Sequence, residues 1–118
     1  MRYLCLIYED EKWWDKATQA DMQQGMAEYN GFTESIKKAG NYIGGEALQP
    51  TKSATSVRVR NGKLSTTDGP YVETKEQLGG YYLIKAKDLN EAVQVASRIP
   101  GAKHGTVEVR PVMEFDQP

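Results

Sequence analysis

The chain has 118 residues, of which 39% are hydrophobic and 26% are charged, and its net charge at pH 7 is -1. That length supports one core, so the sequence predicts a single domain over residues 1–118. The nearly balanced charges form no basic stripe, which argues against nucleic acid as a partner. No segment approaches the roughly 18 apolar residues of a membrane-spanning helix, and no signal-peptide cleavage site follows the start, so we expect a cytoplasmic protein. The single cysteine, Cys5, excludes an internal disulfide, and its place in an apolar strand favours a buried thiol.

The first expected elements are a strand and an amphipathic helix. Residues 2–8 are almost all apolar or aromatic, which is typical of a strand that is apolar on both faces. Thr18 and Asp21 have the spacing of a capping box. Apolar residues then recur at spacings of three and four until Gly40, which ends the helix. These apolar positions are Met22, Met26, Tyr29, Phe32, Ile36 and Ala39.

A second strand and a hairpin follow. Residues 41–48 are predicted to form the strand, and its paired glycines at 44 and 45 indicate a bulge or a close backbone approach. Residues 54–66 form the hairpin, because Asn61-Gly62 is the strongest short hairpin signal and predicts a type I′ turn. That turn pairs Val59 with Leu64. One face of the hairpin then carries Val57, Val59, Leu64 and Thr66, and the other carries Arg58, Arg60 and Lys63 as a solvated face.

The last elements are a strand, a helix and a strand. Residues 79–86 form the first of these, with Tyr81 and Leu83 on one face. Asp88 begins a capping box, and Pro100-Gly101 ends the helix that follows. The apolar stripe of this helix is expected at Leu89, Ala92, Val93, Ala96 and Ile99. The final strand covers residues 105–113, with Val107 and Val109 pointing inward.

The order of these elements predicts an α+β fold. Without the hairpin, the order is a repeated split β-α-β unit, so we expect a ferredoxin-like arrangement with an inserted β-hairpin. Right-handed crossovers place both helices on one face of the sheet. Residues 2–8 and 81–84 are apolar on both sides, and the uncovered face would be too large an apolar patch for a soluble monomer. A two-fold homodimer would cover it, and the space between the two sheets would suit a small ligand.

The loop between the hairpin and the strand expected over residues 79–86 contains the candidate functional carboxylate. Asp68-Gly69 is a turn signal, and Pro70 fixes its own φ and restricts the residue before it. Asp68 therefore stands on a stiff loop, with Tyr71 and Lys75 close behind it. Two interpretations stay open. The carboxylate either bonds nearby backbone amides and only holds its turn, or it serves in a site as a base or a ligand-binding group.

Other reactive side chains suggest less. One histidine, one cysteine and scattered acids give no metal-ligand spacing, so the sequence predicts no metal and no cofactor. The acidic run over residues 9–11 is interpreted as a solvated loop. Trp13-Trp14 either covers a hydrophobic edge or closes a pocket. Arg110 and Glu108, on the outer face of the last strand, are expected to pair with neighbours across strands. The alternative is that Arg110 faces an anion in a cleft.

The chain resembles the YCII-related proteins and, within them, the DGPF-domain subgroup. The segments that carry the resemblance are Asp68-Gly69-Pro70-Tyr71, residues 73–82, Glu108-Val109-Arg110-Pro111 and residues 44–50. Tyr71 stands where the name of the subgroup has Phe, and the two rings pack alike. The resemblance implies a dimeric ferredoxin-like α+β barrel. It also implies an association with extracytoplasmic-function sigma factors, since DGPF-type relatives are their neighbours or are fused to them.

Activity in the YCII family is known for few members. Some relatives are thought to use a His–Asp pair in the cleft, and one is a lyase-like dehydrochlorinase. In this chain Tyr29 or a near neighbour falls where that histidine is expected, and His104 is the only histidine. The pair is therefore not carried over, because a tyrosine does not replace an imidazole that titrates near neutral pH.

These observations define a candidate site with Asp68 as the catalytic carboxylate. Tyr29, Tyr71, Lys75 and Arg110 are the candidate substrate-binding residues. The function expected first is small-molecule binding in a cleft near Asp68, and whether a lyase-like or acid–base reaction follows is left open. The alternative is a non-enzymatic regulatory or interaction module that works with an extracytoplasmic-function sigma factor. A ligand-sized pocket would favour the first, and an exposed patch without a pocket would favour the second.

Overall fold

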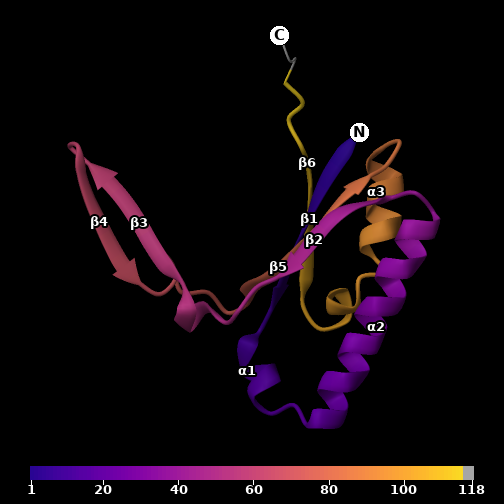
Figure 1. Ribbon diagram of the computed structural model, residues 1–118, viewed down its shortest axis with the longest axis horizontal. Coiled ribbons are helices and arrows are strands. Elements are labelled where there is room, and N and C mark those ends of the chain that lie inside the picture. Colours follow the sequence, from indigo (N-terminus) through magenta and orange to yellow (C-terminus); the bar gives the residue numbers. More distant parts are fainter. Residues whose placement is uncertain (116–118) are drawn as a thin grey trace.

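A four-stranded sheet carries helices on one face, and a two-stranded hairpin stands away from it (Figure 1). This computed structural model describes residues 1–115. The mixed α+β class with antiparallel strands is the predicted one. The strand order in the sheet is β2-β5-β1-β6, and every neighbouring pair is antiparallel. The bounds of these strands are Arg2–Glu9 for β1, Tyr42–Ala47 for β2, Gln77–Lys85 for β5 and Thr106–Pro111 for β6.

Helices α2 (Gln19–Lys38) and α3 (Leu89–Ala96) lie on the same side of the sheet (Figure 1). The expected capping box begins α2: the Thr18 hydroxyl accepts a hydrogen bond from the backbone N–H of Asp21, whose carboxylate accepts one from the backbone N–H of Thr18. Two short 3-10 turns, η1 (Thr51–Ser53) and η2 (Pro100–Lys103), complete the helical segments around the sheet. Within residues 1–115, no helix is long and apolar enough to cross a membrane.

The core lies between the sheet and these two helices. Side chains of β1 and β5 alternate between the two faces of the sheet, as strand geometry requires. Those that point to the helices are buried, together with Phe32 and Ile36 of α2 and Val95 of α3. The buried residues of the two strands are Tyr3, Cys5, Ile7, Tyr82 and Ile84.

The opposite face of the sheet is also apolar. On that face Leu4 is paired with Leu83, and Leu6 is paired with Tyr81. These side chains are half-buried, and no helix of the described residues packs over them. The centre of this second face is therefore apolar, with Glu108 and Arg110 of β6 beside it, and no helix within residues 1–115 covers it.

The hairpin has the register that the sequence predicts. Strands β3 (Thr55–Arg60) and β4 (Lys63–Asp68) form a separate two-stranded sheet in which Val59 pairs with Leu64. The φ angles are 52° at Asn61 and 75° at Gly62. Two successive positive φ angles are the mark of a type I′ turn, so this prediction is confirmed.

The bulge expected in β2 is also present. The pairing of β2 with β5 shifts between Tyr42 and Gly44. A Cβ atom at Gly45 would lie 2.8 Å from the carbonyl oxygen of Tyr81 and 2.9 Å from the ring of Tyr82. The second glycine is thus required by a close approach of the two strands.

The burial of α3 differs from the prediction. Leu89 and Val93 are 52% and 45% exposed, whereas Val95 is buried. The helix faces the sheet mainly through Ala92 and Ala96, whose small side chains allow a close approach of the backbones. The two larger apolar residues therefore turn to solvent, because the close contact uses the alanine side of the helix.

A short helix, α1 (Glu11–Asp15), was not expected. It begins where the sequence suggested a solvated acidic loop. Asp10 caps its first turn by accepting a hydrogen bond of 2.9 Å from the backbone N–H of Lys12. The acidic run is thus partly a helix start, for which a short polar side chain is the preferred cap.

Candidate functional site

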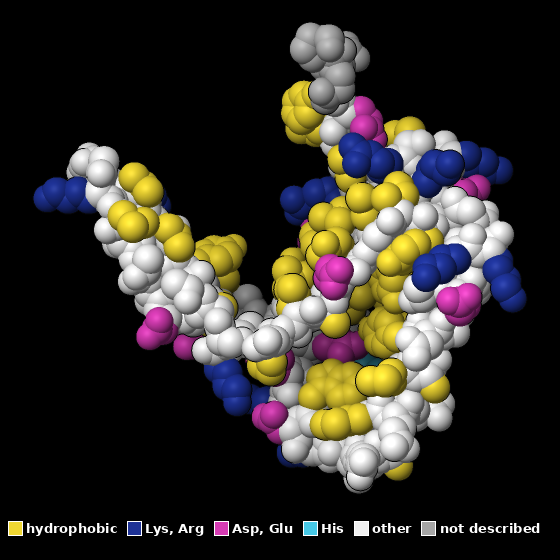
Figure 2. Space-filling model, viewed as in Figure 1, with side chains coloured by type: hydrophobic (Ala, Val, Ile, Leu, Met, Phe, Trp, Pro, Cys, Tyr) yellow, Lys and Arg dark blue, Asp and Glu magenta, His cyan; other side chains and the backbone are white. Residues whose placement is uncertain are grey.

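A cleft of about 740 Å³ lies between α1, the first half of α2 and the sheet edge made by β2 and β5. Figure 2 shows this hollow beside the lower part of α2, with hydrophobic side chains around it and an acidic side chain recessed within it. Most of its wall is apolar or aromatic, which is usual for sites that bind small molecules. The main apolar contributions come from Ile7, Trp14, Met22, Met26, Tyr29 and Tyr82.

Glycines shape the cleft in two ways: one lets α2 lie close to Trp14, and two on the sheet leave space unfilled. A Cβ atom at Gly25 of α2 would lie 3.3 Å from the Trp14 ring, so the helix passes close to that indole. Gly79 and Gly80 line the sheet side and place no side chain in the cleft. Met22 and Met26 are 50% and 68% exposed. The apolar stripe of α2 thus continues past the core and faces the cleft, where flexible methionine side chains adapt to irregular shapes.

Helix α1 is fastened to the far side of the cleft by Glu11. Its carboxylate accepts hydrogen bonds of 2.8 Å from both the backbone N–H and the hydroxyl of Thr51. The backbone N–H of Glu11 donates a hydrogen bond of 2.9 Å to the side-chain oxygen of Gln77. These bonds join the start of α1 to the segment after β2 and to the first residue of β5, so three distant parts of the chain hold the wall of the cleft.

Tyr29 provides the hydroxyl group at the floor of the cleft. Its oxygen accepts a hydrogen bond of 3.1 Å from the backbone N–H of Gly101. Burial, and then the nearby carboxylate of Glu9, raise the pKa of Tyr29 to about 12. The hydroxyl therefore keeps its proton at physiological pH. That proton has no acceptor among the described residues, which leaves Tyr29 able to donate a hydrogen bond into the cleft.

Glu9 stands beside Tyr29. One carboxylate oxygen accepts a hydrogen bond of 2.7 Å from the indole N–H of Trp14. A Cβ atom at Gly101 would lie 2.5 Å from the other oxygen, Oε1, and 2.7 Å from the Tyr29 hydroxyl oxygen. Both groups therefore face the same point of the chain. A donor from Tyr29 and an acceptor from Glu9 lie side by side at one end of an apolar cleft.

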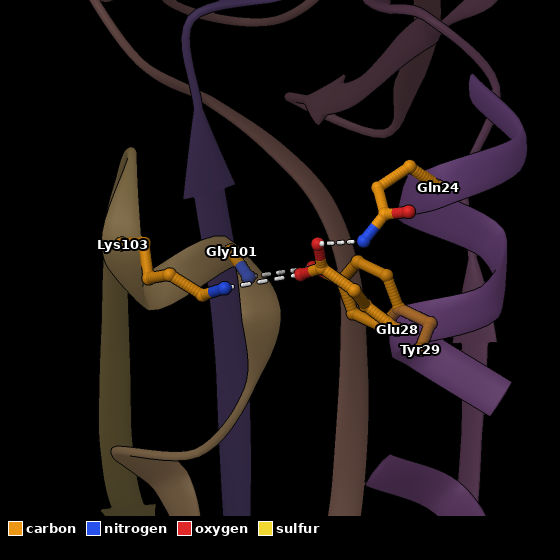
Figure 3. A network of polar contacts seen from close by, with 5 residues as sticks. All are labelled: Gln24, Glu28, Tyr29, Gly101 and Lys103. Atoms are coloured by element: carbon orange, nitrogen blue, oxygen red, sulfur yellow. Dashed lines mark hydrogen bonds and ion pairs between the residues drawn. The ribbon is translucent and has the colours of Figure 1, made fainter. Parts of the chain in front are cut away.

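The position of Tyr29 is reinforced by its neighbour on α2. Figure 3 shows Gln24, Glu28 and Tyr29 on α2 beside Gly101 and Lys103 of η2. Glu28 accepts a hydrogen bond of 3.2 Å from Gln24 and pairs with Lys103 at 3.1 Å. The bond from Gln24 and the charge of Lys103 hold the pKa of Glu28 below its ordinary value. Two contacts thus join α2 to η2, one through Glu28 and one through Tyr29.

Trp14 forms part of the wall at this end of the cleft, and Trp13 packs against it. The Trp13 ring contacts Trp14 edge to face at 4.8 Å and stacks on the His104 ring at 5.1 Å. Of the two interpretations of the Trp13-Trp14 pair, the pocket wall applies to Trp14. Further along the cleft, the hydroxyl groups of Thr33 and Tyr82 form a hydrogen bond of 2.7 Å.

The structure separates the five candidate residues predicted from sequence. Tyr29 lies in the cleft, and the other four do not line it. Asp68 is exposed at the base of the hairpin, opposite Thr55. Its carboxylate makes no hydrogen bond with residues 1–115. The neighbouring Gly69 closes the turn instead, with φ of 97° and an N–H donated to Ala54 at 2.7 Å.

The remaining three candidates are on the surface. Tyr71 is 79% exposed and lies beside β3. Lys75 is exposed in the loop before β5. Arg110 forms an ion pair with Glu108 of its own strand, β6, and not the expected cross-strand pair, because the residues opposite them on β1 are Leu4 and Leu6. No group of three or more histidine, cysteine or acidic side chains in the described chain is arranged to hold a metal ion.

Sequence reasoning missed Glu9 as part of the site and offered Trp14 only as one of two alternatives. The only signal was their position: an acidic residue and a tryptophan directly after a buried strand. The acidic run was interpreted as a solvated loop because nothing local shows that α2 folds back over it.

Comparison with known proteins covers the whole of this architecture. The sequence model of the YCII-related domain matches residues 1–116. An uncharacterised protein of Rhizobium meliloti (strain 1021) is 33% identical over 114 residues, which span 95% of this chain and 92% of that protein. The matched region includes the segments that form both the cleft and the hairpin.

Proposed function

Since this chain belongs to the YCII-related domain family, we propose that it is a member that binds a small molecule in the cleft between α1, α2 and the sheet edge. The observation that carries the proposal is that Tyr29 and Glu9 lie beside each other in a mainly apolar cleft, whose other charged lining residues are Glu11, Asp15, Glu46 and Lys52. An apolar pocket with a few convergent polar groups is the usual form of a ligand site. The presence of such a pocket favours ligand binding over a purely regulatory module.

The two polar groups define what the ligand must offer. Tyr29 donates a hydrogen bond, so the ligand carries an acceptor such as a carbonyl or ether oxygen. Glu9 accepts one, so the ligand carries an N–H or O–H group beside that acceptor. The rest of the ligand is apolar or aromatic, to pack against Trp14 and the two methionines. The raised pKa keeps Tyr29 protonated and makes it a weak acid, so its hydroxyl suits hydrogen bonding to the ligand better than proton transfer.

Two variants test this site. Ligands are first found by a thermal-shift screen of small apolar compounds that carry adjacent donor and acceptor groups. Tyr29→Phe removes the donor and Glu9→Gln removes the charge, and each should weaken binding of those ligands about tenfold or more, as expected for a lost hydrogen bond to a charged or buried group. Glu34→Gln is the matched control, because Glu34 is exposed and lies outside the cleft. Equal affinities for all three variants and the parent would refute the proposed site.

We also propose that the subunit has the ferredoxin-like arrangement and pairs about a two-fold axis through the helix-free face of the sheet. The strand order β2-β5-β1-β6, all antiparallel, supports the arrangement. The half-buried Leu4, Leu6, Tyr81 and Leu83 support the pairing. Light scattering at micromolar protein should report a dimer, and a monomer at that concentration would contradict it.

The segment Asp68-Gly69-Pro70-Tyr71 supports assignment to the DGPF-domain subgroup. It also keeps Asp68 as a candidate site residue. Asp68, Tyr71 and Lys75 stand outside their own cleft, so in this proposal they contribute to a site from a neighbouring subunit. The alternative function, an interaction module for an extracytoplasmic-function sigma factor, would use the same exposed region. A direct test is co-purification of the tagged protein with a sigma factor encoded nearby, compared with the Tyr71→Asp variant.

A further inference from the structure

The hairpin β3–β4 is an exposed arm with one apolar face. It projects from the loops between β2 and β5 and stands clear of the rest of the chain (Figure 1). Val57, Val59 and Leu64 are 60%, 58% and 69% exposed, and the register places all three on one face. The other face carries Arg58, Arg60 and Lys63, which are solvated. The arm is therefore amphipathic, and its apolar side is largely exposed within residues 1–115, with Tyr71 lying beside β3.

The whole chain exposes more surface than its mass requires. Its accessible surface is 8,798 Å², whereas a folded monomer of 13.2 kDa exposes about 6,400 Å². Its radius of gyration is 16.5 Å, against about 13.5 Å for a folded domain of this length. The excess of about 2,400 Å² is larger than the roughly 800 Å² per partner that a standard interface buries, so there is surface enough for a stable subunit contact.

An isolated hairpin of this kind needs a partner surface. A two-stranded hairpin alone is marginally stable in water, and three exposed branched side chains on one face add an apolar cost. Yet the turn and all six residue pairs of the arm are regular. A preformed arm of this kind loses little conformational entropy when it docks, so the structure is suited to packing its apolar face on another surface.

A second copy of the same chain offers a suitable surface. Figure 2 shows hydrophobic side chains along the arm and along the sheet, separated by an open gap. The sheet residues are those of the helix-free face, and a partner subunit seated on that face would enter the gap between sheet and arm. The apolar side of the arm would then cover the partner, while its cationic side would stay in water.

We propose that the β3–β4 hairpin is an arm that clasps a second copy of this chain, packing Val57, Val59 and Leu64 on the partner subunit. This rests on the two-fold dimer proposed above and adds a second contact to it, and it holds whether or not the cleft binds a small molecule. Each subunit then contacts its partner through two surfaces, the helix-free face of the sheet and the apolar face of the arm.

Leu64→Asp tests the arm, with Ser65→Asp as the matched control. The two variants add the same charge to adjacent residues of β4, but Leu64 lies on the apolar face and Ser65 on the cationic face. Sedimentation across a range of micromolar concentrations gives the dimer dissociation constant. Leu64→Asp should raise it by about a hundredfold or more, because each dimer loses two buried leucines, one on each arm. Ser65→Asp should leave it nearly unchanged.

The outcomes separate the two proposals. If the parent dimerises and Leu64→Asp dimerises equally well, the arm is not a clasp, although the sheet-face dimer stands. If the parent is monomeric throughout, both proposals fail, and the arm then serves a different protein. If Leu64→Asp alone is monomeric, the clasp is supported.

Thiol protection gives a second measurement that does not depend on a charged variant. Cys5 is fully buried, so it does not react with an added reagent in the folded protein. A thiol introduced by Leu64→Cys should be alkylated about tenfold more slowly than one introduced by Ser65→Cys when the protein is concentrated. The difference should disappear on dilution below the dimer dissociation constant. Equal rates at high concentration would overturn the clasp.

Discussion

Tyr29 in α2 accepts a hydrogen bond of 3.1 Å from the backbone N–H of Gly101, so a glycine far along the chain sets the place of the cleft hydroxyl. A Cβ atom at residue 101 would lie 2.5 Å from Glu9 Oε1, 2.7 Å from the Tyr29 oxygen and 2.9 Å from Ile7 Cγ2. All three are below normal contact. A side chain at residue 101 would therefore disturb both the packing of the fold and the positions of Tyr29 and Glu9 in the cleft.

Gly101→Ala should destabilise the protein by about 1–3 kcal/mol, the usual cost of overpacking a closed site. It should also displace Tyr29 or Glu9 and weaken ligand binding in the cleft. Urea unfolding measures the first effect and calorimetry the second. Gly31→Ala is the control, because a Cβ atom there meets nothing within 4 Å and Ala is favoured over Gly in a helix by about 1 kcal/mol. If Gly101→Ala is as stable as the parent, the close packing around residue 101 is wrong.

Tyr29→Phe should lower stability in a pH-dependent way. Near neutral pH the Gly101 N–H loses its acceptor, which costs about 1 kcal/mol or more. The folded pKa of Tyr29 is raised from 10.0 to about 12, so its contribution to stability is complete below the unfolded value. That contribution is lost as pH rises through the folded value. The free energies of unfolding of parent and variant should therefore converge between those two pH values.

Urea titrations of both proteins at increasing pH check this convergence. Tyr71→Phe serves as the control, because Tyr71 is exposed and its removal should leave the difference from the parent flat across the same range. A Tyr29→Phe difference that stays constant with pH would show that Tyr29 is not buried beside Glu9.

Local signals in the sequence account for the elements that were predicted well. The type I′ turn depends only on Asn61 and Gly62, and the start of α2 depends only on Thr18 and Asp21. Each is a short segment whose backbone and side chains satisfy one another. The alternation in β1 and β5 likewise follows from their own residues, since strand side chains point to opposite faces.

The candidate site was harder to predict because it depends on distant contacts. Glu9 becomes a site residue only because Gly101 and α2 lie against it, and Trp14 only because Gly25 lets the helix pass. The stiff loop predicts a fixed direction for the Asp68 carboxylate, but stiffness alone does not show which way the loop faces. The hairpin was recognised, but its projection away from the sheet is set by the connecting loops.

Gly62→Val should disrupt the tip of the arm. Gly62 has φ of 75°, a region that β-branched residues strongly disfavour. The change should cost more than the roughly 0.4–1 kcal/mol of a benign glycine substitution. Because the arm is exposed, the effect is best measured by hydrogen exchange of amides in β3 and β4, which should become faster. Asn61→Gly is the control and should keep the turn, since Gly-Gly also suits type I′. Unchanged exchange in Gly62→Val would contradict the turn assignment.

Asp68→Asn tests whether this carboxylate acts beyond its own turn. Asp68 is exposed and its carboxylate makes no hydrogen bond within residues 1–115, while Gly69 closes the turn through Ala54. The substitution keeps the shape and removes the charge, so it should change stability by about 0.5 kcal/mol or less. If Asp68 contributes to a ligand site in the assembled protein, the variant should lose the ligand-induced thermal shift while its own melting temperature stays the same. Glu73→Gln, a nearby exposed change of the same kind, should keep both. A variant that binds the same ligands as the parent removes Asp68 from the site and leaves Tyr29 and Glu9 as its polar groups.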